Sequence, residues 1–109
     1  MITVTLLGRI SSMKELITTQ NEKKVLNFSV VNNRYSGTEQ IPDFFNVVAW
    51  DATAQFVEKY FKVGQFIMIS GTIINDTYEK DNVKYYNQKI VATHVEFAGY
   101  NKSDISEKE

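Results

Sequence analysis

The sequence predicts an all-β fold, a five-stranded barrel with one short helix between the third and fourth strands. Several stretches alternate between apolar and polar residues, which is typical of strands with one buried face. A single stretch has its apolar residues at helical spacing instead. The chain has 109 residues, 43% of them hydrophobic and 23% charged, so it has the size and composition of one globular domain.

The first two predicted strands are residues 2–10 and 24–35. Ile2, Val4 and Leu6 alternate with Thr3, Thr5 and Leu7, and Gly8 is expected to form a bend or bulge. Residues 11–23 are polar and poorly periodic, which predicts a loop. In the second strand the predicted inward residues are Leu26, Phe28 and Val30, and the outward ones are Asn27, Ser29, Val31, Asn33 and Tyr35.

The third predicted strand, residues 42–50, follows a hairpin loop at 36–40 that contains Gly37. Alternation places Phe45, Val47 and Ala49 in the core and Phe44, Asn46, Val48 and Trp50 on the outer face. Burial does not account for two outward aromatic rings. A face that combines aromatic and hydrogen-bonding residues is what unpaired bases need for stacking, which contributes roughly 1–3 kcal/mol per base.

The helix is expected at residues 52–61, with Asp51 as N-cap and Gly64 closing its C-terminal end. Its apolar face is predicted to consist of Val57, Tyr60 and Phe61. Strands at 65–78 and 83–97 follow, joined by a charged turn at 79–82. This element order is that of the OB-fold, a Greek-key barrel that binds oligonucleotides across its second and third strands. We expect one domain at 1–97 and a short, frayed polar tail at 98–109.

Six segments resemble the bacterial and phage single-stranded DNA-binding proteins, in the order and with the spacing of that family. They are Leu7-Gly-Arg-Ile, Asn27-Phe-Ser-Val-Val-Asn-Asn-Arg-Tyr, Asp43-Phe-Phe-Asn-Val-Val-Ala-Trp, Tyr60-Phe-Lys-Val-Gly-Gln, Ile69-Ser-Gly-Thr-Ile and Val91-Ala-Thr-His-Val-Glu-Phe. The resemblance implies base stacking on Tyr35, Phe44, Trp50 and Tyr78. It also implies a homo-oligomer, a tetramer or alternatively a dimer, with the first strand in the dimer contact, in the cytoplasm of a bacterial cell or phage-infected host.

Five basic residues form the best available patch for phosphate contacts, although each of them is also explained by a solvated surface. They are Arg9, Lys23, Arg34, Lys84 and Lys89. Lys14 also has both explanations, a phosphate contact or a solvated surface. Of Tyr85 and Tyr86, at most one is expected to extend the stacking surface, because alternation directs the other inward. The net charge is −1, so we expect a weaker salt dependence than for a strongly basic binder.

Two features depart from the family. The segment Thr72–Tyr78 lacks the arginines that relatives carry there, and the sequence stops at Glu109 without an acidic tip ending in phenylalanine. We therefore expect no recruitment of other proteins through such a tail, and a phage or mobile element as the source.

Other functional classes find little support. The sequence contains no cysteine and one histidine, His94, so no metal site and no cofactor are expected. It has no phosphate loop and no nucleophile elbow, which argues against an enzyme. It also has no apolar run long enough to span a membrane.

The predicted function is therefore non-catalytic binding and protection of single-stranded DNA during replication, recombination or repair, with little sequence preference. The alternatives are an OB-fold interaction subunit of the primosomal-accessory type and an RNA-binding OB protein.

Overall fold

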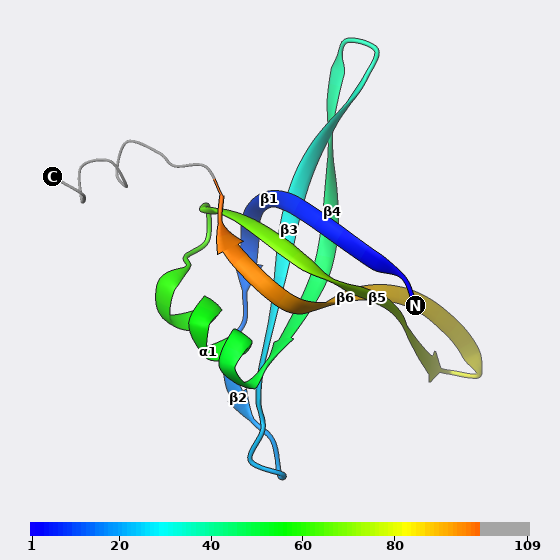
Figure 1. The fold of residues 1–109 in the computed structure, drawn as a ribbon. Coiled ribbons are helices and arrows are strands. Elements are labelled where there is room, and N and C mark those ends of the chain that lie inside the picture. The colour runs from blue at the N-terminus through cyan, green and yellow to red at the C-terminus, as the bar shows by residue number, and fades with distance from the viewer. Residues whose placement is uncertain (99–109) are drawn as a thin grey trace, which may run out of the picture.

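The computed structural model describes residues 1–98 and confirms the predicted barrel (Figure 1). Its elements are β1 (Thr3–Met13), β2 (Ile17–Thr18), β3 (Lys24–Ser36), β4 (Glu39–Trp50), α1 (Asp51–Tyr60), β5 (Phe66–Lys80) and β6 (Val83–Phe97). The two-residue β2 lies in the segment expected to be a loop, so the single helix follows the fourth strand of the structure rather than the third. Apart from Ala98, the predicted tail lies outside the described residues.

The strands form one sheet that closes on itself. The order is β1-β5-β6-β4-β3-β2, and an additional β1–β3 pairing completes the ring. All pairings are antiparallel except that of β4 with β6, which is parallel and covers only Val47–Ala49 against Ile90–Ala92. Elsewhere along their length these two strands diverge, so the barrel wall is open beside them.

The core consists of the inward residues of the long strands together with one face of α1. Leu26, Ile67 and Ile69 are completely buried, and Ala54 and Val57 of the helix pack into the same cluster. Alternation therefore predicted the inward residues Leu26, Phe28 and Val30 of β3 correctly, because this strand has one face against the barrel interior. In the first predicted strand Leu6 is buried, whereas Ile2 precedes β1 and is exposed.

The expected bulge at Gly8 is wrong. Gly8 lies in a regular ladder with Ile67, and the irregularity falls between Ile10 and Ser12, after β1 has exchanged β5 for β3 as its partner at Arg9. Gly8 has a different role. A Cβ at this position would collide with the Val31 carbonyl oxygen and lie 2.8 Å from Val30 Cγ1, so glycine permits the close approach of β1 and β3.

The predicted caps of the helix are also wrong. Trp50 is the N-cap, with extended backbone and no capping side chain, while the Asp51 carboxylate accepts a hydrogen bond from the Lys24 backbone N–H at 3.0 Å. The helix ends at Tyr60, and Gly64, with φ of 97°, lies in the turn beyond it. Tyr60 is half-exposed rather than part of the buried face.

Two residues of β4 depart from the predicted alternation. Phe45 was expected in the core but is 38% exposed, because β4 is not paired with β6 before Val47 and the barrel wall is open at Phe45. Val48 was expected outside but is buried. It is flanked by Asn27 of β3 and Val91 of β6, so neighbouring strands cover it on both sides.

Two hairpins project beyond the barrel (Figure 1). The β3–β4 hairpin turns at Gly37, which has φ of 65°, and the β5–β6 hairpin turns at Asp81 and Asn82, with φ of 54° and 62°. Both turns are shorter than expected, because the paired strands continue almost to the tips. The hairpins extend the surface available to a ligand beyond the core.

Candidate nucleic-acid interface

The outer face of the β3–β4 ladder carries the two aromatic residues of β4 that alternation predicted to point outward. Directly paired residues of neighbouring strands share a face, and the register pairs Phe44 with Val31 and Trp50 with Val25. Phe44 is 65% exposed and Trp50 is 41% exposed. Six residues of extended chain separate them by about 20 Å, so several nucleotides fit between the two rings.

Tyr35 lies on the same face, farther toward the hairpin tip. It pairs with Gln40 and has the same alternation parity as Val31, the partner of Phe44. The side chain is 75% exposed. Phe44, Trp50 and Tyr35 are therefore all accessible from one side of the ladder, and their contact with DNA stays a prediction.

Tyr78 lies in the β5–β6 hairpin and contacts a second aromatic residue. Its ring is stacked on that of Tyr85, its direct partner in the β5–β6 ladder, with centroids 5.1 Å apart and planes 15° from parallel. Tyr86 is 73% exposed and Tyr85 42% exposed, so the expectation that one of the two would be inaccessible is wrong. The hairpin has left the barrel at this point, and neither of its faces meets a core.

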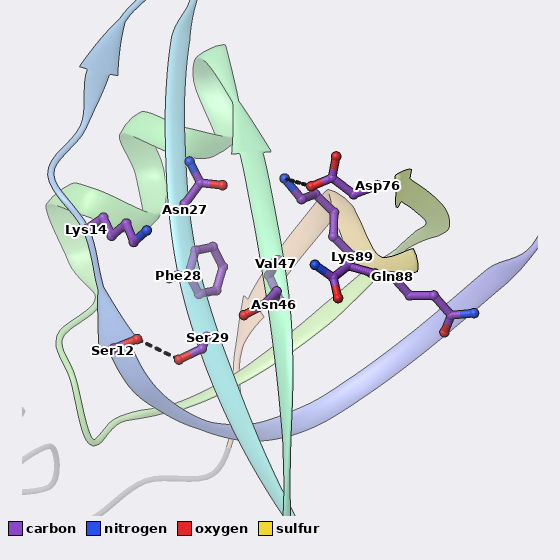
Figure 2. Close-up of a pocket in the computed structure, with 11 residues that line it drawn as sticks. Ser12, Lys14, Asn27, Phe28, Ser29, Asn46, Val47, Asp76, Gln88 and Lys89 are labelled. Carbon is purple, nitrogen blue, oxygen red and sulfur yellow. Dashed lines mark hydrogen bonds and ion pairs between the residues drawn. The ribbon is translucent and has the colours of Figure 1, made fainter. Parts of the chain in front are cut away.

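A polar groove of about 260 Å³ crosses the β3–β4 ladder between Phe44 and Trp50 (Figure 2). It is lined by Ser12, Lys14, Asn27, Phe28, Ser29, Asn46, Val47, Asp76, Asn87, Gln88 and Lys89. Figure 2 shows Lys14 on one side of the two strands and Lys89 on the other, so an amide-rich and hydroxyl-rich floor lies between two cationic side chains. Such a groove offers donors to phosphates and hydrogen-bonding atoms to base edges.

Two of the five predicted basic residues form ion pairs within the chain. Arg34 Nε lies 2.7 Å from Asp43 Oδ2, and Lys89 Nζ lies 3.1 Å from Asp76 Oδ2. The dashed line between Lys89 and Asp76 in Figure 2 marks the second pair. Each carboxylate offsets a charge that would otherwise be available to a phosphate.

Arg9 is also engaged, and away from the groove. Its Nη1 donates to the Gly64 carbonyl oxygen at 2.9 Å, and its guanidinium carbon lies 4.0 Å from the centre of the Phe66 ring. Both partners belong to the α1–β5 turn and the start of β5. The structure therefore does not bring Arg9 together with the other predicted basic residues.

Lys23 and Lys84 have no ion-pair partner among residues 1–98. Lys23 precedes β3, and Lys84 lies near the tip of the β5–β6 hairpin directly opposite Glu79. They belong to different hairpins, β2–β3 and β5–β6, and Arg9 contacts the α1–β5 turn, so no described contact joins the five predicted residues into one patch.

The groove includes residues that sequence reasoning did not select as site residues, chiefly Lys14, Asn46 and Gln88. The sequence pattern could have identified Asn46 as a site residue, because it lies between Phe44 and Trp50 on the same predicted face. Lys14 lies in the loop after β1 and Gln88 lies in β6, so no pattern within β4 relates them to Asn46.

The described part of the chain contains no group of three or more His, Cys, Asp or Glu residues placed to hold a metal ion. Nor does any helix among these residues have the length and apolar character needed to cross a bilayer.

Comparison with known proteins agrees with the resemblance seen in the sequence. The model of the single-strand binding protein family matches residues 1–98. A protein named single-stranded DNA-binding protein 2 from Streptococcus agalactiae is 33% identical over 93 residues, which cover 83% of this chain and 71% of the relative. A protein named single-stranded DNA-binding protein 1 from Clostridium acetobutylicum is 32% identical over 109 residues, which cover 94% of this chain and 97% of the relative. With the barrel and its aromatic face described above, these matches show that the chain belongs to the single-strand binding protein family.

Proposed function

We propose that this protein binds single-stranded DNA without catalysing a reaction and protects strands exposed during replication, recombination or repair in the bacterial cytoplasm. The observation that carries the proposal is that Phe44 and Trp50 are both exposed on β4, on either side along the strand of Asn46, which lines the polar groove. Family membership supports the same function.

Stacking supplies the main binding energy in this proposal. Every base has a flat π-surface, so exposed rings of Phe44, Trp50, Tyr35 and Tyr78 hold bases of any sequence. The bases of a duplex are already stacked on one another and paired, so their faces are not accessible to these rings. The protein therefore discriminates single strands from duplexes and shows little preference among sequences.

Electrostatic attraction has a smaller part. Of the basic residues that the sequence or the groove assigns to this surface, Lys14, Lys23 and Lys84 lack an ion-pair partner among the described residues. Lys89 becomes available only when a phosphate replaces Asp76 as its partner. Fewer free cations mean fewer counterions released on binding, and so a weaker dependence of affinity on salt.

We further propose that the protein is a homo-oligomer that uses β1 and the open side of the barrel. Residues 3–8 of β1 pair with β5 along one edge, while pairing with β3 begins only at Arg9. An apolar cavity of about 410 Å³ lies alongside. Val4, Leu6 and Phe45 line the part proposed for this contact, and the cavity also borders the DNA surface, because Phe44, Asn46, Gln88 and Lys89 belong to its lining. An unpaired strand edge beside an apolar surface favours association with a second copy.

The single tryptophan provides a direct test. We would titrate the protein with oligo-dT while following Trp50 fluorescence at low and high salt, with a duplex of equal length as control. The proposal expects strong quenching by the single strand that largely survives high salt and is absent with duplex. Absence of quenching by any nucleic acid would contradict it and point to a protein partner, while stronger quenching by oligo-rU than by oligo-dT would assign the surface to RNA.

A further inference from the structure

The stacked pair Tyr78–Tyr85 is the best-defined feature of the β5–β6 hairpin. The two residues are direct partners in the antiparallel ladder, and their rings are nearly parallel, 15° apart, at a centroid distance of 5.1 Å. They lie where the hairpin has left the core, and both remain more than 40% exposed. Burial therefore does not explain the pair.

The stacking restricts the orientation of Tyr78. An isolated exposed tyrosine on a hairpin samples several rotamers, and binding a base would restrict it to one of them at an entropic cost. Tyr85 is stacked on one face of the Tyr78 ring, and Tyr78 nevertheless remains 47% exposed, so part of the ring stays accessible to a base. The two stacked rings therefore restrict each other to nearly parallel orientations before any ligand binds.

We propose that Tyr85 is a positioning residue for the bound strand, one that holds the Tyr78 ring ready to stack on a base with its free face. This inference rests on the proposed function and adds a residue to it. It also gives the β5–β6 hairpin a defined role, to hold the strand at a point outside the groove between Phe44 and Trp50.

Tyr86 offers an internal comparison. It is the next residue of β6, it is more exposed than Tyr85, and alternation places it on the other face of the hairpin. The described residues contain no ring stacked on Tyr86. If any exposed tyrosine on this hairpin sufficed, the two positions would be equivalent.

The test is a double-mutant cycle on affinity for an oligo-dT long enough to reach the hairpin, about 16 nucleotides. We expect Tyr85→Ala to weaken binding about two- to tenfold, the range for an aromatic pair in contact. Tyr85→Phe keeps the ring and should bind like the wild type, as should Tyr86→Ala. In a Tyr78→Ala background the Tyr85→Ala change should have almost no further effect, because Tyr85 acts through Tyr78.

Other outcomes separate this inference from the proposed function. If the wild type binds oligo-dT but Tyr85→Ala equals Tyr86→Ala, the positioning role is wrong and the proposed function stands. Equal losses from Tyr85→Ala with and without Tyr78 would also overturn the positioning role. If the wild type fails to bind any single strand, the proposed function itself is wrong. Thermal unfolding of each variant shows whether the substitution in the hairpin destabilises the barrel. Tyr85→Leu replaces Tyr85→Ala if the alanine variant does not fold.

Discussion

Lys89 and Asp76 form an ion pair at the side of the groove, with Nζ and Oδ2 3.1 Å apart. Both residues line the groove, and the Lys89 side chain is only 27% exposed. A carboxylate in this position repels phosphate and competes for the lysine. The ion pair therefore lowers the affinity of the protein for DNA.

Removing the Asp76 charge should strengthen binding. Asp76→Asn keeps the shape of the side chain and releases Lys89, so we expect affinity for oligo-dT at low salt to rise about two- to fivefold. The slope of log K against log salt should steepen by about 0.7, the value for one more phosphate contact on a single strand. Asp81→Asn, the same charge change at the hairpin tip, is the control. Equal gains in the two variants would show a general charge effect and no specific role for the pair.

The wild-type salt dependence should be shallow. Arg9, Arg34 and Lys89 have partners within the chain, so Lys14, Lys23 and Lys84 are the cations assigned to the DNA surface that remain to release counterions. We expect a slope no steeper than about −2, which corresponds to about three phosphate contacts. Fluorescence titrations at a series of salt concentrations measure it directly, and a slope near −5 would mean that phosphates displace the internal partners of these residues.

Trp50→Ala should weaken binding by about 1–3 kcal/mol through the loss of one stacking ring. Tyr60→Ala is the matched control, since Tyr60 is also half-exposed but belongs to α1 and not to the β3–β4 face. Because Trp50 also begins the helix, the thermal stability of both variants must be measured. A folded Trp50→Ala protein with unchanged affinity would remove Trp50 from the site.

Gly8→Ala should destabilise the fold rather than alter DNA contacts. The added methyl group would collide with the Val31 carbonyl oxygen, which belongs to the backbone and has little freedom to move. We expect a loss of about 1–3 kcal/mol in the free energy of unfolding, measured by urea denaturation. Gly37→Ala, where the added carbon would meet nothing within 4 Å, isolates the cost of a positive φ. If both variants cost the same, close strand contact is not the reason for glycine at position 8.

Phe45→Glu should shift the protein to a lower mass in light scattering. Phe45 is partly exposed at the open side of the barrel and lines the apolar cavity there, and a carboxylate at a buried contact between copies is unfavourable. Val63→Glu, at an exposed position in the turn after α1, is the control. An unchanged mass in the Phe45 variant would place the contact between copies elsewhere.

Alternation of residue types was sufficient to predict most of the barrel. A strand with one face in the core needs an apolar residue at every second position, and this local requirement is visible in Leu26, Phe28 and Val30 without any knowledge of their neighbours. The same rule identified Phe44 and Trp50 as outward before the fold was known. The rule failed at Phe45 and Val48, because their burial depends on where β6 pairs with β4, and that pairing joins residues far apart in the chain.

The electrostatics and shape of the candidate site depended on tertiary structure. Asp76 and Lys89 lie on different strands, as do Arg34 and Asp43, and only hairpin formation brings each charge to its partner. The Tyr78–Tyr85 stack likewise requires the exact register of two strands, since a shift of one residue would place the rings on opposite faces. Alternation within a strand shows which face of the sheet a side chain lies on. The ion-pair or stacking partner of that side chain depends on pairing between strands that are separated in the sequence.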